Sequence, residues 1–369
     1  MRAREAAALD GRILDAIGRW DLGEAAFDRL ARDLFAHQVR YNAPYAAFAA
    51  ACGYGRDRLP ESWRQIPAVP SLAFKESVMA TFPSSETVVA FHTSGTTAAT
   101  SGKHFFEPSS LALYDAALLA AFDRFMLDGD PSLRLRYFLL VPARATSSLG
   151  YMMRRVAGER GDGHERTYLD ESADRLDVEA FVAELQRAHD EGVPACIAGT
   201  AFAFVALIDA LGGRKLRAAP GSRIMETGGF KGRSREIARD ELYAMLSASL
   251  DIPYERIVAE YGMTELTSQY YDAPASRAAA SRRKTGPPWL RALVVGSDGK
   301  EVPAGEIGVL RHIDLANRGS VIAIETEDLA LRCQDDEFIL LGRDAQAPLR
   351  GCSLDAEDLR DSAPLVTRP

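Results

Sequence analysis

The stretch Phe91–Phe106, "FHTSGTTAATSGKHFF", gives the first indication of the fold. An apolar segment, "TVVAFH", leads directly into a loop of serine, threonine and glycine that closes at Ser101-Gly102-Lys103. Small residues let backbone N–H groups approach an anion, hydroxyl groups add donors, and a lysine offsets negative charge. A flexible surface loop can have the same composition, but the position directly after a strand favours phosphate binding.

This loop differs from the P-loop of nucleoside triphosphatases. Six residues separate Gly95 from Gly102-Lys103, where the P-loop has four, and His104 replaces the serine or threonine that should follow the lysine. A P-loop enzyme is therefore disfavoured. His92 and His104 flank the loop, and each could bind phosphate or the incoming carboxylate, or have a local structural role. The histidines contain no H-x-x-x-H pair that would indicate a metal site.

Strands and helices alternate on the C-terminal side of the loop, which predicts an α/β core. Four apolar segments predict buried strands, and all but the first lead into a predicted helix. The strands are "RLRYFLLVPA", "VPACIAG", "SRIMETGG" and "RIVAEYG"; the helices are 202–211, a helix with Ala238, Leu242, Met245, Leu246 and Leu250 on one face, and a helix that opens at Met263-Thr264-Glu265.

The two ends of the chain differ from this core. The first fifty residues predict helices, because Phe27, Leu30, Ala31 and Leu34 recur at helical spacing, and Asn42-Ala43-Pro44 should end one helix and start another. From Leu293 onward the pattern predicts short strands, with a hairpin turn at residues 297–300 and a last short helix.

The composition narrows the function classes. The chain has 369 residues and a net charge of −8, which argues against a nucleic-acid or anionic-membrane binder. The basic runs Arg282-Arg283-Lys284 and Arg214-Lys215 are short, and solvated loops are expected there. The longest apolar run is too short to span a membrane comfortably, and residues 1–10, which are charged and lack an apolar core, do not predict a signal peptide. The four cysteines are far apart, which is typical of neither a disulfide framework nor a zinc site, so a reduced cytoplasm is expected.

Two further loops follow predicted strands. In "METGGFKGRSRE", Gly228-Gly229 permits a plain turn or a close approach to a flat ligand. In "AEYGMTELTSQYY", Tyr261-Gly262 ends a strand, and Thr264 and Glu265 stand where a phosphate or a metal-bridged phosphate could bind. A first-turn helix carboxylate is the alternative role for Glu265.

In order, TSGTT, YGMTE, TEDL and LGRD resemble the motifs of the adenylate-forming superfamily of acyl- and aryl-CoA ligases, luciferases and peptide-synthetase adenylation domains. The segments "FAHQVRYNAPYAAF", "IPAVPSLAFK", "ETGGFKGR" and "LRGCSL" look like the acyl-protein synthetase (LuxE-like) family, relatives of phenylacetate-CoA ligase. With these segments the resemblance covers nearly the whole chain. It implies the α/β fold of the large N-terminal domain of these enzymes, with mixed sheets layered with helices and a β-rich part.

The resemblance implies a set of site residues for ATP and Mg²⁺. The loop Thr93, Ser94, Gly95, Thr96, Thr97 and Lys103 would bind the triphosphate, and Gly228, Gly229, Tyr261 and Gly262 the adenine region. Thr264 would contact the α-phosphate, Glu265 would bind Mg²⁺, Asp328 would accept the ribose hydroxyls, and Arg343 would reach ribose or phosphate. Lys231 is a candidate for charge compensation near the substrate carboxylate.

Two departures from the superfamily pattern shape the expected mechanism. Ala98-Ala99 stands where many relatives have glycine, and we expect no counterpart of the mobile C-terminal lid and its lysine. We therefore expect an AMP-binding domain over residues 1–343, with an N-terminal helical segment, and a short C-terminal segment over 344–369 that carries Cys352.

Cys352 matches the LuxE-like cysteine that accepts the acyl group as a thioester and passes it to a partner reductase. A free thiol titrates near ~8.5; Arg350 and Arg343 would lower this pKa, whereas Asp355 and Glu357 would oppose them. A buried structural thiol is the alternative, and it is the role expected for Cys52, Cys196 and Cys333.

The expected function is therefore activation of a carboxylic acid, fatty or aryl, as acyl-AMP, followed by transfer to Cys352. Two alternatives stay open: a ligase of the same superfamily that delivers the acyl group to CoA or a carrier protein, and a nucleotide-binding subunit that has lost catalysis. Retention of Thr264, Glu265, Asp328 and Arg343 argues against the second.

Overall fold

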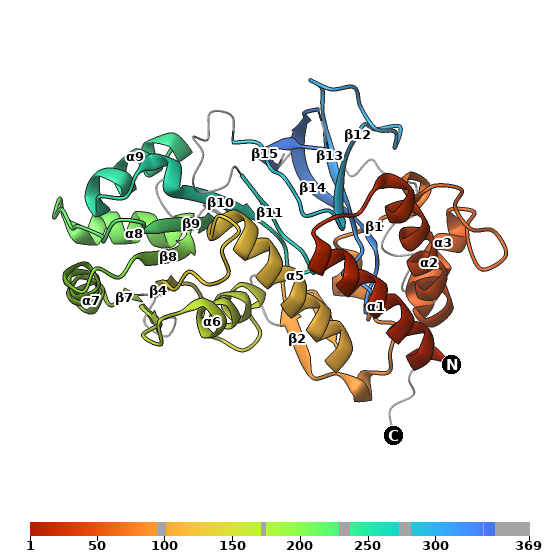
Figure 1. Cartoon of the computed structure of the whole chain (residues 1–369). Coiled ribbons are helices and arrows are strands. Elements are labelled where there is room, and N and C mark those ends of the chain that lie inside the picture. The colour runs from red at the N-terminus through yellow and green to blue at the C-terminus, as the bar shows by residue number, and fades with distance from the viewer. Residues whose placement is uncertain (94–100, 171–174, 229–236, 273–281, 335, 344–369) are drawn as a thin grey trace. The chain divides into compact units, whose positions relative to one another are not determined.

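The computed structural model describes residues 1–369 except 94–100, 171–174, 229–236, 273–281, 335 and 344–369 (Figure 1). Its contacts divide the chain into two compact units. Unit 1 comprises 1–117, 263–268 and the described residues from 285 onward, and unit 2 comprises 118–262 and 269–284, without the masked residues. The sequence did not predict this subdivision, in which a short segment of unit 1 lies inside the sequence of unit 2.

Unit 1 combines N-terminal helices with mostly antiparallel strands. Its elements are α1 (Arg2–Arg19), α2 (Glu24–Tyr41), α3 (Ala43–Ala51), η1 (Trp63–Gln65), β1 (Val69–Pro70), α4 (Ala73–Glu76), η2 (Ser84–Glu86), β2 (Val89–His92), β3 (Lys103–Phe106), the first half of α5 (Pro108–Met126), β12 (Leu290–Val295), β13 (Ile307–Asp314), β14 (Ala323–Arg332) and β15 (Phe338–Arg343). One sheet runs β1-β14-β13-β12 with β15 on β14, and β2 pairs with β3.

The predictions for unit 1 are largely confirmed. Phe27 and Leu34 of α2 are buried, as their helical spacing requires. Asn42 ends α2 and caps α3, where its side chain accepts a hydrogen bond from the Tyr45 N–H (3.1 Å). The predicted hairpin turn also forms, because Gly296 N–H donates to the Lys300 carbonyl (2.9 Å) between β12 and β13.

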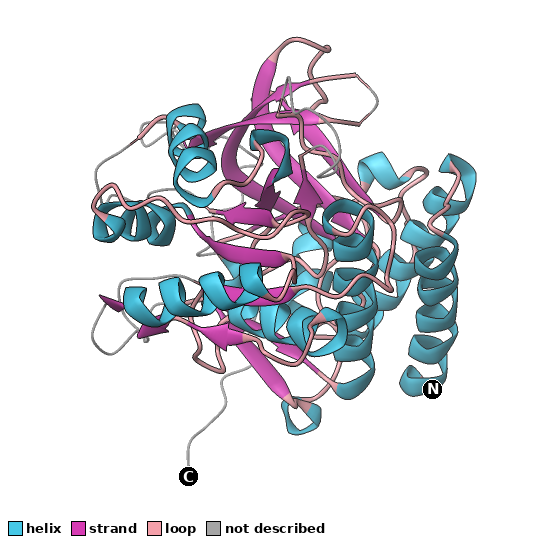
Figure 2. Ribbon diagram, turned by 60° about the vertical axis from the view of Figure 1, so that its left-hand side comes forward, coloured by secondary structure: helices cyan, strands magenta, loops and turns pink. Residues whose placement is uncertain are grey.

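Unit 2 is a doubly wound α/β layer structure (Figure 2). Its elements are the second half of α5, β4 (Arg136–Leu140), α6 (Ser148–Arg160), β5 (Arg166–Thr167), β6 (Leu169–Asp170), β7 (Arg175–Leu176), α7 (Val178–Asp190), β8 (Ala195–Thr200), α8 (Ala201–Leu211), β9 (Arg223–Thr227), α9 (Arg239–Leu250), η4 (Tyr254–Arg256), β10 (Ile257–Tyr261) and β11 (Tyr270–Tyr271). The six-stranded order is β11-β10-β9-β8-β4-β5, parallel except at β11.

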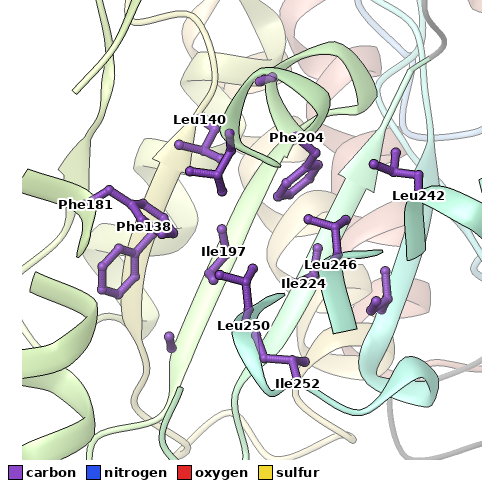
Figure 3. Close-up of a cluster of buried hydrophobic side chains, with 14 of the residues drawn as sticks. Phe138, Leu140, Phe181, Ile197, Phe204, Ile224, Leu242, Leu246, Leu250 and Ile252 are labelled. Atoms are coloured by element: carbon purple, nitrogen blue, oxygen red, sulfur yellow. The ribbon is translucent and has the colours of Figure 1, made fainter. Parts of the chain in front are cut away.

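Helices cover both faces of the sheet in unit 2. Every residue of β4, β9 and β10 is therefore buried, whichever face its side chain points to. On one face, Phe138 and Ile197 pack with residues of α7, α8 and α9 in a continuous core (Figure 3). On the other face, Tyr137 meets Phe122 of α5 with ring centroids 6.2 Å apart. The predicted strand in each of the four apolar segments is therefore confirmed.

One prediction for the segment Met263–Ser268 of unit 1 and one for the basic run of unit 2 are wrong. The helix expected at Met263-Thr264-Glu265 is a turn, in which Leu266 N–H donates to the Met263 carbonyl (3.1 Å). The basic run expected to be solvated is partly buried: Lys284 is 1% exposed and donates to the Ala259 carbonyl (2.6 Å), and Arg282 pairs with buried Asp272 (2.8 Å). Among the described helices, none combines the length and apolarity needed to cross a lipid bilayer.

Candidate functional site

In unit 1, the base of the predicted phosphate loop is a closed β-hairpin. His92 pairs with Lys103 across β2 and β3, and Thr93 N–H donates to the Gly102 carbonyl (2.9 Å). The Thr93 hydroxyl in turn accepts from Gly102 N–H (2.8 Å). Gly102 packs closely here, because a Cβ would lie 3.2 Å from the backbone of Phe74. The hairpin therefore fixes both ends of the loop, whose members Ser94, Gly95, Thr96 and Thr97 lie outside the described residues.

Lys103 begins β3 and is exposed at this same end of the hairpin. Its neighbour His104 is 1% exposed and has a local structural role, which was one of the two predicted possibilities. His104 Nδ1 lies 2.8 Å from the Thr264 carbonyl oxygen, and since that oxygen only accepts, Nδ1 carries the hydrogen. Burial lowers the pKa of His104 to about 4, so the ring is neutral at physiological pH. The hairpin is thereby bonded to the turn that carries Thr264.

That turn, Met263–Ser268, is held by Asp314, the last residue of β13, and by Asn317 in the loop that follows it in unit 1. Asp314 accepts hydrogen bonds from Thr267 N–H (2.9 Å), Ser268 N–H (2.9 Å) and the Ser268 hydroxyl (2.8 Å). Asn317 donates from Nδ2 to the Glu265 carbonyl (2.9 Å). The N–H groups that a helix would use are bonded to Asp314 instead, which is why the predicted helix does not form.

Thr264 and Glu265 lie together on this turn. The backbone carbonyl oxygen of Thr264 accepts a hydrogen bond from His104, and that of Glu265 accepts one from Asn317. Glu265 is 8% exposed, and Thr264 is half-buried. The sequence did not predict His104, Asp314 and Asn317 as the supports of this pair, although the polar residues at the end of a strand in "IDLAN" were a usable signal.

Asp328, predicted to accept the ribose hydroxyls, and Arg343, predicted to reach ribose or phosphate, lie side by side in unit 1. They are direct partners across β14 and β15, and Arg343 Nε donates to Asp328 Oδ1 (2.9 Å). The Arg343 side chain is 62% exposed, whereas that of Asp328 is 13% exposed. A half-buried carboxylate held by an exposed guanidinium is a suitable acceptor for a diol.

The predicted adenine residues that the structure describes lie at the carboxyl ends of β9 and β10 in unit 2. Gly228 follows β9 with φ of +74°, a left-handed conformation that favours glycine, and a Cβ there would meet no atom within 4 Å. Tyr261 ends β10, with its ring centroid 6.0 Å from that of Tyr270, and Gly262 follows it. Ligands of open α/β sheets bind at such strand ends. Gly229 and Lys231 lie outside the described residues.

These strand ends also contain buried acids that the sequence reasoning missed. Glu226 is 3% exposed and accepts from the Tyr243 hydroxyl (2.8 Å), and burial raises its pKa. Glu260 is 6% exposed and accepts a hydrogen bond from the Thr227 hydroxyl. Burial raises the pKa of Glu260 to about 7, against the opposing effects of that hydrogen bond and of Lys284.

The described cysteines and carboxylates limit what else this part of the chain offers. Cys196 is fully buried in β8, and burial raises its pKa to about 12, which suits the predicted structural role. Within the described residues, no group of three or more His, Cys, Asp or Glu side chains is arranged to hold a metal ion. Cys352, the predicted acyl acceptor, lies outside the described residues.

Comparison with known proteins identifies the fold. No protein-family model matches the sequence, and no curated protein matches it by sequence. The structure is similar to 2-hydroxyisobutyryl-CoA ligase in an open conformation with 2-HIB-AMP and CoA, with a TM-score of 0.61 and 12% identity over 86% of this chain and 69% of that chain.

Two further solved structures agree with this result. The same ligase in the thioesterification state gives a TM-score of 0.60 and 13% identity over 94% of this chain and 70% of that chain. McyG A-PCP complexed with phenylalanyl-adenylate gives 0.50 and 14% over 72% of this chain and 48% of that chain. The chain therefore has the α/β fold of adenylate-forming ligases, as the motif resemblance predicted.

Proposed function

We propose that this chain activates a carboxylic acid with MgATP, forms an acyl-AMP, and carries the acyl group as a thioester on Cys352 for transfer to a partner. The observation that most strongly supports this function is the anchored turn that presents Thr264 and Glu265, in a fold similar to that of a ligase solved with its acyl-adenylate. Fatty and aryl acids both remain candidates for the substrate.

The proposed reaction has two balanced steps. A carboxylate oxygen attacks the α-phosphorus of ATP, and the bond to pyrophosphate breaks. The Cys352 thiolate then attacks the acyl carbonyl and AMP leaves. The protein contributes mainly position and electrostatic stabilisation.

Each candidate site residue has a proposed task in these steps. The triphosphate is held by Thr93, Ser94, Gly95, Thr96, Thr97 and Lys103, and the adenine region by Gly228, Gly229, Tyr261 and Gly262. Thr264 contacts the α-phosphate, Asp328 accepts the ribose hydroxyls, Arg343 reaches ribose or phosphate, and Lys231 offsets the charge of the substrate carboxylate.

The residues on the turn fit a magnesium ion bound largely by phosphate. Mg²⁺ at nucleotide sites is usually held by one or two carboxylates together with phosphate oxygens and water. Glu265 supplies one largely buried carboxylate on a backbone fixed through its own carbonyl group. The ion would neutralise phosphate charge as pyrophosphate leaves.

Replacing Glu265 with glutamine should lower the rate of ATP–pyrophosphate exchange about 10- to 100-fold, because the amide removes one negative ligand for Mg²⁺ while keeping the size of the side chain. The loss should be partly reversed by raising the Mg²⁺ concentration. Glu76, on helix α4, provides the matched control, and Glu76→Gln should exchange at the wild-type rate. Equal rates for Glu265→Gln and the wild type at low Mg²⁺ would contradict the metal role.

The acceptor is tested by intact-protein mass spectrometry after incubation with MgATP and a panel of fatty and aromatic acids. We expect a mass gain of one acyl group that hydroxylamine removes and that is absent in Cys352→Ala. Cys333→Ala should still gain the mass. Pyrophosphate exchange without any mass gain, followed by formation of acyl-CoA, would instead favour a ligase that uses an external thiol.

This alternative has support of its own, because one similar structure contains CoA and another is described as an A-PCP protein. The two functions differ only in the acceptor, so Cys352→Ala separates them. A wild-type protein that neither exchanges pyrophosphate nor gains mass with any acid would instead indicate a nucleotide-binding subunit without catalysis.

A further inference from the structure

The carboxyl ends of β9 and β10 are joined by the side chain of Glu260. One carboxylate oxygen, Oε2, accepts a hydrogen bond from Thr227, the last residue of β9. The other oxygen, Oε1, packs against Gly262, where a Cβ would lie 2.5 Å from it. Glu260 thus connects the residue before Gly228 with the glycine that follows Tyr261. We call this set, Thr227, Glu260 and Gly262, the strand-end clasp.

Placing a carboxylate in a buried position between two strands costs free energy, because burial penalises its charged form. The same two strands are filled by apolar side chains lower down, where Ile224 pairs with Ile257 and Met225 with Val258. At the carboxyl ends, where a ligand of an open α/β sheet binds, the polar side chains of Thr227 and Glu260 take their place. The position of Glu260 therefore indicates a task connected with the ligand rather than with the core.

We propose that Glu260 is a positioning residue for nucleotide binding, which sets the spacing between the Gly228 and Tyr261-Gly262 strand ends through its contacts with Thr227 and Gly262. The proposal rests on the proposed function, since it assumes that these strand ends receive the adenine. Glu260 acts through its neighbours and need not contact ATP. Gly262 is part of the device, because any side chain there would displace the carboxylate.

The ionisation of Glu260 gives the clasp a distinct signature. Three groups act on its pKa besides burial, which dominates: the Thr227 hydroxyl and the Lys284 ammonium lower it, and Glu226 raises it. Glu226 lies next to Thr227 in β9 and points to the opposite face, so it does not share the hydrogen bond. With a pKa of about 7, Glu260 becomes the stronger, charged acceptor for Thr227 as the pH rises from 6 to 8.

The test measures the KM and kcat for ATP in pyrophosphate exchange, and the Kd for ATP by calorimetry, between pH 6 and 8. Thr227→Val should raise the KM and Kd about tenfold at pH 8 with kcat within twofold, and Thr227→Ser, which keeps the hydroxyl, should restore both. In the wild type the KM should fall as the pH rises through about 7, and in Glu260→Gln this dependence should disappear.

The matched control is Tyr243→Phe, which removes a hydroxyl bonded to the other buried acid, Glu226, on the opposite face of the same strand. Its KM for ATP should stay within twofold of the wild-type value. An equal rise in KM for Tyr243→Phe and Thr227→Val, or an unchanged pH profile in Glu260→Gln, would overturn the positioning role while the proposed function stands. A wild-type protein that neither binds ATP nor exchanges pyrophosphate would overturn both.

Discussion

Replacing Arg318 with methionine is expected to lower the free energy of unfolding of unit 1 by about 3–5 kcal/mol, because it leaves buried Asp10 without its cation and buried Glu107 with Arg2 as its remaining cation. The Arg318 side chain is fully buried, and it donates to Asp10 from Nε (2.7 Å) and Nη2 (3.0 Å). It also donates to Glu107 and to the Ser109 hydroxyl. One guanidinium therefore joins helix α1, the segment before α5 and the loop after β13.

The measurement is urea unfolding followed by tryptophan fluorescence, since Trp20, Trp63 and Trp289 all lie in unit 1. The control is Arg12→Met, which breaks an exposed pair with Asp33 (2.7 Å, side chains 47% and 56% exposed) and should change stability by less than about 1 kcal/mol. A loss below 1 kcal/mol for Arg318→Met would contradict the assignment of this cluster as a structural anchor.

The same variant should weaken the pH dependence that this cluster gives to the stability of unit 1. Burial would raise the pKa of Glu107, but the hydrogen bonds and charges of Arg318 and, to a smaller extent, of Arg2 hold it below its ordinary value. A carboxyl group with a depressed pKa stabilises the fold above its unfolded pKa, and this contribution is lost as the pH falls. Without Arg318, burial favours the protonated acid, so the stability difference from the wild type should narrow as the pH falls toward 4.

Replacing Asp314 with asparagine should destabilise unit 1 by about 3 kcal/mol, because two of the four groups that donate to the carboxylate would then face an NH₂ group. Asp314 Oδ2 accepts from the N–H groups of Thr267 and Ser268, and Oδ1 accepts from the Ser268 hydroxyl and Ala316 N–H. An amide has one oxygen, so it can satisfy only one of these pairs. Asn is the informative change because it keeps the volume.

The effect on activity separates this role from simple loss of stability. In conditions where Asp314→Asn is still folded, kcat for pyrophosphate exchange should fall about tenfold or more, because Thr264 and Glu265 depend on the turn that Asp314 holds. Trp289 fluorescence should also shift, since its Nε1 donates to the Ser268 hydroxyl (3.1 Å). The control is Asp130→Asn at the exposed loop before β4, for which neither change is expected. Wild-type kcat in a folded Asp314→Asn would contradict the link to the site.

The parts of the fold that the sequence predicts well are those specified by local pattern. The buried strands β4, β8, β9 and β10 were predicted correctly because parallel strands covered on both faces are largely apolar. Helix α5 was missed, because the nearly continuous apolar segment around Leu118 gives no clear polar face. Lys284 was expected in solvent because nothing near it in sequence shows that it bonds to β10.

The same distinction applies to the candidate site. Asp328 and Arg343 were identified from motifs, and the antiparallel register brings them together. The turn at Thr264 was predicted as a helix, because the carboxylate that captures its N–H groups, Asp314, comes 46 residues after Ser268. Glu260 drew no attention because a glutamate in a strand is unremarkable in sequence, and only burial and the contact with Gly262 distinguish it. Hydrogen bonds between residues far apart in the sequence could not be predicted from local pattern.

The placement of the turn Met263–Ser268 has a consequence for synthesis on the ribosome. This turn is translated between β10 and β11, yet it belongs to unit 1 and depends on Asp314. At about 5–20 residues per second, the 46 residues between Ser268 and Asp314 take on the order of 2–10 s to appear. The strands of unit 2 can pair during that delay, whereas helix α1 must wait for Arg318. We therefore expect unit 1, whose segments lie before, within and after unit 2 in the sequence, to complete its folding last. Until then its newly made N-terminal helices would be exposed to chaperones.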